Sequence, residues 1–164
     1  MELSVSRIQE EVTEEDLWFV IKNPWKFTYY EWKLYNIHNE KIALELLLEQ
    51  VKLARKDGYS KTWRTQDNLP LAILAAYKVE DTKLDCFFIA SKHMEEHRQS
   101  LKVSFELRKI LEVQSYSYKG CTLRLYSESK EIESQTTWLR FLGFKYKPEG
   151  NLGNYRHFEY QSKV

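Results

Sequence analysis

The sequence predicts an α+β fold, a single domain over residues 1–164 whose mixed, mostly antiparallel sheet carries helices on both faces. Two helical apolar patterns precede three strand-like runs joined by short polar turns, and the order helix, strand, helix, strand, strand follows them. A chain of 164 residues can bury a sizeable core in one domain, and it shows no internal repeat or linker-like tract.

Composition and charge narrow the functional classes. The 25 Lys and Arg against 24 Asp and Glu leave a formal charge of +1, which gives no global field favouring nucleic acid. Apolar runs are too short to span a membrane, and the first residues lack the pattern of a secretory signal. Two cysteines, Cys86 and Cys121, are too few for a disulfide framework. We therefore expect a cytoplasmic protein with reduced, buried thiols, no membrane span and no specific nucleic-acid partner.

The first part of the chain predicts one weak strand and two helices. Residues 3–9 alternate weakly between apolar and polar side chains. Thr13 precedes three acidic residues and an apolar run, which is typical of a capped helix start, and Asn23-Pro24 ends that helix. A second helix is expected over 40–56, with Gly58 as its stop. Its apolar stripe is expected to comprise Ile42, Leu46, Leu47, Val51, Leu53 and Ala54.

Three strands are expected next, over residues 61–66, 69–79 and 83–90. Polar turns at 66–69 and 80–82 separate them, and such short turns join antiparallel neighbours.

The last part predicts a helix at 95–114 and a strand at 121–126. That helical crossover places the new strand parallel to strand 83–90. A helix at 130–142 and strands at 144–147 and 155–160 complete the order. The apolar residues of the long helix are Leu101, Phe105, Leu107, Ile110, Leu111 and Val113.

Aromatic residues make up 15% of the chain and many crowd into residues 18–35. They either wrap a small core or form an interface, because Trp and Tyr often anchor protein contacts. The contact surface expected for protein partners comprises Trp18, Trp25, Tyr29, Tyr30 and Trp32.

Residues 138–144 read Trp-Leu-Arg-Phe-Leu-Gly-Phe, and Gly143 suits the left-handed position that ends a helix. This segment, residues 69–76 and the element order together resemble the GNAT superfamily of N-acyltransferases across nearly the whole chain. The resemblance implies the GNAT fold, and for its enzymes acetyl-CoA as acyl donor.

In GNAT enzymes a glycine-bearing loop follows the strand that matches residues 83–90, and its backbone N–H groups hold the pyrophosphate of acetyl-CoA. Glycine is favoured there because bare backbone must approach phosphate closely. Here residues 91–100 contain no glycine, and Glu95 and Glu96 bring negative charge. The resemblance leaves these candidate cofactor residues: Ile89, Ala90, Lys92, His93, His97 and Arg98.

Many GNAT enzymes place a tyrosine four residues before the glycine of Leu-Gly-Phe, where its hydroxyl protonates the leaving thiolate. That position is Leu139, which has no proton to give. Tyr126 and Tyr146 are geometric substitutes, although Tyr126 also suits the strand end. Glu128, after the strand at 121–126, is a candidate base or an acidic residue of the first turn of the next helix.

Residues 93–97 read His-Met-Glu-Glu-His, which matches a zinc-peptidase pattern with two histidines one helical turn apart. No third ligand is evident, and the segment lies at a strand-to-helix junction. We therefore expect a solvated helix start and no metal site.

A GNAT-like group found in phages resembles this chain more closely than the enzymes do, through residues 87–91, His97 and 138–144. Ile132 stands where that group has asparagine. The resemblance implies a virion-associated or assembly role in which acyl transfer is lost. The leading hypothesis is thus a catalytically degenerate GNAT-fold protein with no cofactor, acting through protein contacts. The alternative is an acetyl-CoA-dependent N-acyltransferase with an atypical CoA loop.

Overall fold

A computed structural model describes residues 10–26, 39–96, 99–127, 132–153 and 155–162. The weak strand expected at 3–9 lies outside them. The described helices are α1 (Glu14–Lys22), α3 (Glu40–Lys56), α4 (Gln99–Ser117) and α5 (Ile132–Leu142), with 3₁₀ turns η1 (Lys92–Glu95) and η2 (Pro148–Gly150). The strands are β1 (Gly58–Arg64), β2 (Pro70–Glu80), β3 (Lys83–Ala90), β4 (Thr122–Ser127), β5 (Lys145–Tyr146) and β6 (Arg156–Gln161).

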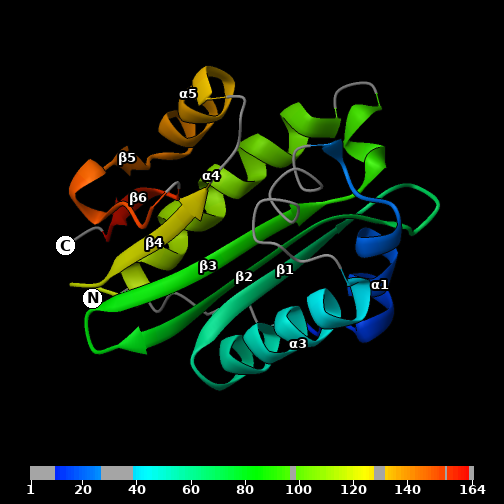
Figure 1. Cartoon of the computed structure of the whole chain (residues 1–164), viewed down its shortest axis with the longest axis horizontal. Helices are drawn as coiled ribbons and strands as arrows, with labels where there is room; N and C mark the ends of the chain where they lie inside the picture. The colour runs from blue at the N-terminus through cyan, green and yellow to red at the C-terminus, as the bar shows by residue number, and fades with distance from the viewer. Residues whose placement is uncertain (1–9, 27–38, 97–98, 128–131, 154, 163–164) are drawn as a thin grey trace, which may run out of the picture.

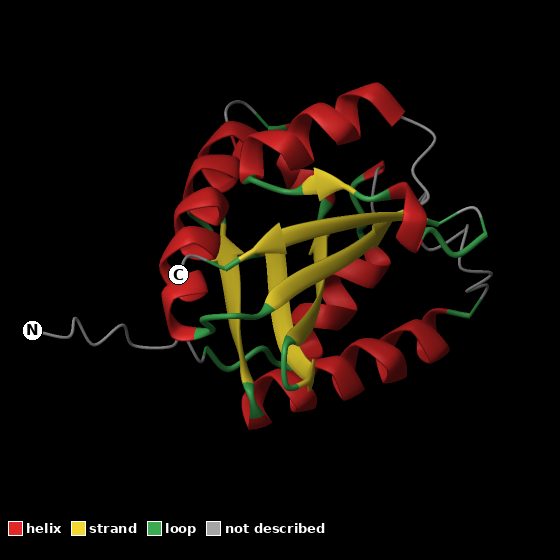
Figure 2. Ribbon diagram, turned by 90° about the vertical axis from the view of Figure 1, so that its left-hand side faces the viewer, coloured by secondary structure: helices red, strands yellow, loops and turns green. Residues whose placement is uncertain are grey.

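The described strands form one sheet in the order β1-β2-β3-β4-β6-β5. Every neighbouring pair is antiparallel except β3 and β4, which are joined by the α4 crossover and run parallel. Helices lie on both sides of the sheet (Figures 1 and 2). The α+β class and the parallel pairing that the sequence predicts are confirmed.

Alternation along β2 divides the core into two layers. Ala72, Leu74 and Ala76 pack with residues of α4 and α5, whereas Ile73 and Ala75 pack with residues of α1 and α3. We call these two sides the α4/α5 face and the α3 face. Because the side chains of a strand alternate, every residue of the central strands can be assigned to one face.

The two long helices begin and end near their expected bounds, and each buries only some of its apolar residues. On α3 the side chains of Ala43, Leu47, Val51 and Ala54 are buried, whereas Ile42, Leu46 and Leu53 are exposed. On α4 the buried apolar side chains are Val103, Leu107 and Leu111, whereas Leu101, Phe105 and Val113 are exposed. Each helix thus buries only part of its apolar residues, because it covers only part of one sheet face.

Helix α3 ends at Lys56, its expected last residue, and Gly58 follows the cap, but without the positive φ of a left-handed helix end. The helix is capped by Asp57, and Gly58 is the first residue of β1. A Cβ at position 58 would lie 1.9 Å from the carbonyl oxygen of Ala76. Glycine is therefore needed for the close approach of β1 to β2.

The helix end at Gly143 is confirmed. Gly143 has φ +110°, and its N–H donates to the carbonyl of Arg140 while the N–H of Phe144 donates to that of Leu139. This is the double hydrogen bond of a Schellman motif, which turns the chain from α5 towards β5.

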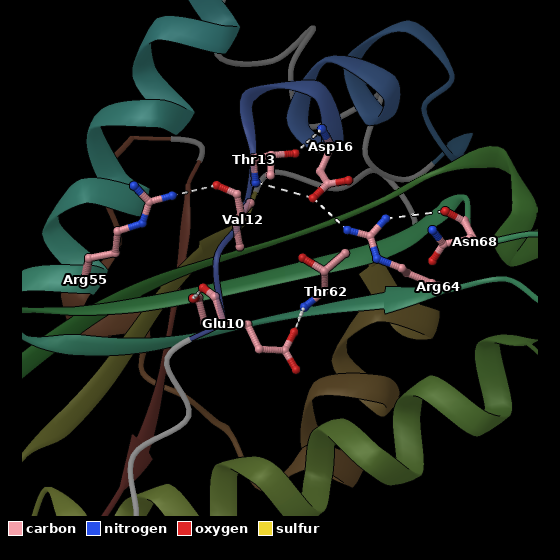
Figure 3. A network of polar contacts seen from close by, with 9 residues as sticks. Glu10, Val12, Thr13, Asp16, Arg55, Thr62, Arg64 and Asn68 are labelled. Atoms are coloured by element: carbon pink, nitrogen blue, oxygen red, sulfur yellow. Dashed lines mark hydrogen bonds and ion pairs between the residues drawn. The ribbon is translucent and has the colours of Figure 1, made fainter.

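The segment before α1 is bound to the outer edge of β1 (Figure 3). The Glu10 carboxylate accepts the backbone N–H of Thr62 at 2.8 Å, and Arg55 donates to the carbonyl of Val12 at 2.8 Å. Thr13 and Asp16 form a reciprocal capping box, as expected of Thr13. These contacts hold α1 on the α3 face and cover a strand edge that would otherwise be open.

Candidate functional site

The parallel pair β3–β4 opens after three residue pairs. Its ladder joins Lys83–Asp85 to Thr122–Arg124 and stops there, while β4 stays paired with β6 along its full length. The two central strands therefore splay apart towards their carboxyl ends. The sheet leaves a gap at the end where ligands often bind in parallel α/β arrangements.

A cavity of about 520 Å³ lies at this splay. This volume is within the usual range of small-molecule sites. Its lining comes from both sheet faces, so the cavity passes between β3 and β4. On the α3 face it is lined by Ala43, Leu46, Leu47, Gln50, Tyr77, Asp85, Phe87, Ile89, Arg124 and Tyr126. The other lining residues are Trp25, Cys86, Phe88, Met94, Ser100, Leu101, Ser104, Leu125, Ser134, Gln135, Trp138 and Leu139.

Asp85 and Arg124 are the charged residues of the described lining, and they pair with each other. Arg124 donates from Nε to Asp85 Oδ1 at 2.7 Å and from Nη2 to Oδ2 at 3.2 Å. The hydrogen bond to Asp85 raises the pKa of Arg124. Because the pair is internally neutral, the described lining carries no net charge and favours an uncharged ligand.

Two other titratable groups beside this pair are held in their neutral forms. Burial, with the Asp85 charge as a smaller cause, raises the pKa of Tyr77 to about 12. Burial also raises the pKa of the Cys86 thiol well above its ordinary value of 9.0, again with help from Asp85. Neither group supplies a ready nucleophile or base near neutral pH.

Aromatic side chains narrow the cavity on the α4/α5 face. The Trp138 indole donates to Ser104 Oγ at 2.8 Å and contacts the Phe88 ring, with ring centroids 5.4 Å apart. Leu139, the next residue of α5, is 1% exposed. The position at which many GNAT enzymes carry a proton-donating tyrosine is therefore apolar and buried.

The backbone N–H groups of the segment that follows β3 are hydrogen-bonded within the protein. The N–H of Ser91 donates to Leu71, and that of Lys92 to Asn23. His93 donates to Ser91 Oγ and Met94 to the Ser91 carbonyl. The N–H of Glu96 donates to the carbonyl of His93, and the N–H of Gln99 donates to the carbonyl of Glu96. Six described N–H groups between 91 and 99 thus already have acceptors within the chain.

Side chains fix the same segment. His93 Nδ1 lies 2.5 Å from Glu96 Oε1, and the His93 ring stacks on Phe19 of α1 at 5.9 Å between centroids. Pro24 forms an isolated antiparallel bridge with Ser91. Residues 91–96 are therefore attached to the α1 region through both backbone and side-chain contacts.

The structure brings together only some of the candidate residues named from the sequence. Ile89 and Tyr126 line the cavity, and the buried Ala90 ends β3 beside it. Lys92 is exposed and His93 is engaged with Glu96. His97, Arg98 and Glu128 lie outside the described residues.

The expected contact surface is described only at Trp18 and Trp25. Both are partly buried and pack against the core, and Trp25 also lines the cavity. Lys22 lies over the Trp18 ring. Tyr29, Tyr30 and Trp32 lie outside the described residues.

The sequence did not indicate Tyr77, Asp85 or Arg124, because they come from three strands and meet only through the sheet register. The sequence did contain a weak indication that His157 pairs with Glu159, namely their spacing of two residues. His157 Nε2 lies 2.9 Å from Glu159 Oε1, and residues two apart on a strand share a face. The His157 ring also contacts Tyr126, which connects this pair to the cavity wall.

Groups of three or more His, Cys, Asp or Glu side chains placed to hold a metal do not occur in the described part of the chain. Likewise, the helices that the structure describes include none long and apolar enough to cross a membrane.

Comparison with known proteins identifies the architecture. No protein-family model and no curated protein sequence matches the chain significantly. Solved structures do match. PaiA N-acetyltransferase from Thermoplasma acidophilum, solved with coenzyme A, superposes with a TM-score of 0.59 at 14% identity, covering 93% of this chain and 96% of its own. An acetyltransferase from Streptococcus agalactiae gives a TM-score of 0.64 at 12% identity, covering 93% and 95%.

The fold is that of the GNAT N-acetyltransferases. A phosphinothricin acetyltransferase of the GNAT superfamily from Sinorhizobium meliloti, solved with acetyl-CoA, also matches, with a TM-score of 0.58 at 10% identity over 92% of this chain and 85% of its own. These low identities establish the GNAT fold alone, because one fold serves many functions.

Proposed function

We propose that this chain is a GNAT-fold protein that does not use acetyl-CoA as the enzymes do and acts through contacts with other protein subunits. The observation that carries the proposal is the set of backbone donors after β3. Six described N–H groups between Ser91 and Gln99 are bonded inside the protein. A pyrophosphate site needs several unengaged N–H groups aimed at one point.

The charge of the same segment supports the proposal. Glu95 and Glu96 place carboxylates where the resemblance puts the phosphates, and Glu96 is held there by His93. The described cavity lining offers no unpaired cation, because Arg124 is paired with Asp85. A phosphate-rich ligand would therefore meet repulsion with little compensation.

The loss of a proton donor is a separate argument. Leu139 fills the tyrosine position with a buried apolar side chain. Of the two other tyrosines named from the sequence, Tyr126 is on the cavity wall with its ring against His157, whereas Tyr146 is not among the described lining residues. Among the described residues, the bonded backbone donors after β3 and the apolar Leu139 both favour a retained scaffold over a working enzyme.

The resemblance to the phage proteins suggests the setting: assembly, or association with the virion. The test is whether purified virions contain the chain in a fixed number of copies per virion. Absence from mature particles would limit the role to a transient assembly contact.

Calorimetric titration with acetyl-CoA tests the proposal directly. The PaiA enzyme, whose structure contains coenzyme A, is the positive control. We expect no heat of binding at millimolar acetyl-CoA. Affinity in the micromolar range or tighter would overturn the proposal.

One observation favours an alternative, an acetyl-CoA-dependent N-acyltransferase with an atypical loop: the open cavity at the splay. In that case the backbone of Ile89 and Ala90 would hold the pantetheine arm and residues 92–98 the phosphates. Glu128 or a water would act as base. An Arg98→Glu change should then abolish acetyl-CoA binding, and unchanged affinity would remove residues 92–98 as the phosphate site.

A further inference from the structure

The edge of β3 that faces the splay presents an open backbone position at Phe88. Ser91 donates its N–H towards β2, so by alternation Ile89 and Phe87 also point their backbone groups at β2. Phe88 and Ala90 therefore point theirs into the splay. The ladder to β4 ends at Asp85, so no strand of the described chain pairs with Phe88 there.

The chain itself already places extended backbone on this edge. Trp25 donates its N–H to the carbonyl of Ala90 at 2.9 Å, and Asn23 accepts the N–H of Lys92 at 2.8 Å. Pro24 lies opposite Ser91 as an antiparallel bridge. Residues 23–25 are thus a short antiparallel strand addition opposite residues 90–92. A further segment at Phe88 would continue an existing interface.

The cavity walls suit an extended chain of low polarity. Successive side chains of a strand point to opposite faces. One set would meet Leu47 and Phe87 on the α3 face, and the other would meet Leu101 and Trp138 on the α4/α5 face. A charged side chain of the bound segment could pair with Asp85 or Arg124 only by breaking the ion pair between them.

We propose that the cavity binds an extended, uncharged segment of a partner polypeptide, which adds as a strand to β3 at Phe88. The inference rests on the proposed function and locates its protein contact in the cavity at the β3–β4 splay. Main-chain hydrogen bonds to the β3 edge would give affinity, and the apolar walls would select side chains.

The test uses the full chain and a capped hexapeptide of alternating valine and threonine. Its matched control is the same peptide N-methylated at alternate amides, which keeps the side chains and removes the donors of one edge. We expect tryptophan fluorescence to report binding of the first peptide in the high-micromolar to millimolar range and at least about tenfold weaker binding of the second. Hydrogen exchange should slow at Phe88.

Matched variants on each wall test the location. Leu46 and Ile42 are 48% and 50% exposed on α3, and only Leu46 lines the cavity. Leu101 and Phe105 are each 55% exposed on α4, and only Leu101 lines it. We expect Leu46→Glu and Leu101→Glu to weaken peptide binding about tenfold, and Ile42→Glu and Phe105→Glu to leave it unchanged. Thermal melts check that all four variants fold.

Three outcomes would overturn the inference: no binding of the peptide at several millimolar, equal binding of the N-methylated peptide, or equal losses in the matched variants. Its failure is distinct from that of the proposed function. Tight acetyl-CoA binding would overturn the proposed function whether or not the peptide binds. If neither the peptide nor acetyl-CoA binds, only the strand addition is overturned.

Discussion

Asp85 and Arg124 form a two-point ion pair at the last residue pair that β3 and β4 share. Beyond this pair the two strands separate and the cavity begins. The pair thus marks the point where the sheet opens. It fastens the two strands together and neutralises the charged groups that line the site.

Breaking this pair should destabilise the protein measurably. Arg124→Met leaves a partly buried carboxylate without its partner, and we expect a loss of about 1–2 kcal/mol in the free energy of unfolding. Lys83→Met is the matched control, because Lys83 pairs with Glu80 at an exposed position and should cost less than about 0.5 kcal/mol. Urea unfolding of both variants measures the difference. Equal losses would show that the pair is no more than a surface contact.

The glycine that ends α5 offers a second prediction. At Gly143, φ is +110° and an added Cβ would lie 2.6 Å from Cε2 of Tyr160, so Gly143→Ala combines backbone strain with overlap in the core. We expect a cost of about 2–3 kcal/mol in unfolding free energy. At Gly120, φ is +77° but an added Cβ would meet nothing within 4 Å.

Gly120→Ala is therefore the matched control and should cost about 1 kcal/mol, from backbone strain alone. Thermal or urea unfolding of the two variants provides the comparison. If both substitutions cost the same, the packing of Tyr160 against Gly143 does not contribute.

The contrast between Gly143 and Arg124 shows what the sequence can reveal. Gly143 was identified from local spacing, and β3 was predicted at its observed bounds, because both depend on neighbouring residues. The pairing of Asp85 with Arg124 depends on strand register across 39 positions. The hydrogen bond from the N–H of Lys92 to the carbonyl of Asn23 joins residues that are still farther apart in the sequence. It engages an N–H group that could otherwise donate to a phosphate.

The exposure of several apolar residues on α3 and α4 could not be predicted for a related reason. Apolar periodicity gives the direction of a helix face but not how much of that face the sheet covers. Leu46 and Leu101 continue an apolar stripe, yet they border the cavity instead of the core. Sequence alone therefore predicted the scaffold well and the walls of the cleft poorly.

The Cys86 thiol makes stability depend on pH in the alkaline range. Its pKa is raised in the folded state above an ordinary value of 9.0, chiefly by burial. The folded protein therefore keeps a proton that the unfolded chain loses above about pH 9. Stability from this group is complete below that pH and falls as pH rises, by about 1 kcal/mol per pH unit. Tyr77, with its pKa raised from 10.0 to about 12, adds a smaller loss above about pH 10 because it is partly exposed.

Urea midpoints measured between about pH 8 and about pH 11 test this dependence. Cys86→Ala removes one titrating group, so its midpoint should fall less steeply than that of the unmodified chain. Parallel pH profiles for the two proteins would show that Cys86 ionises equally in the folded and unfolded states.

Leu139→Tyr introduces the hydroxyl that many GNAT enzymes use. This variant tests whether the absence of that hydroxyl alone would account for a lack of acyl transfer. Leu139 is 1% exposed and lies in the core layer of α4 and α5. A larger side chain with a polar end should cost about 2–3 kcal/mol in unfolding free energy, whereas Leu139→Met should cost about 1 kcal/mol. We expect no thioester cleavage from acetyl-CoA by Leu139→Tyr, because the backbone donors after β3 remain bonded within the chain. Release of free CoA thiol, followed with a thiol reagent, measures this. Turnover above that of Leu139→Met would mean that the cleft still binds acetyl-CoA and would contradict the proposed function.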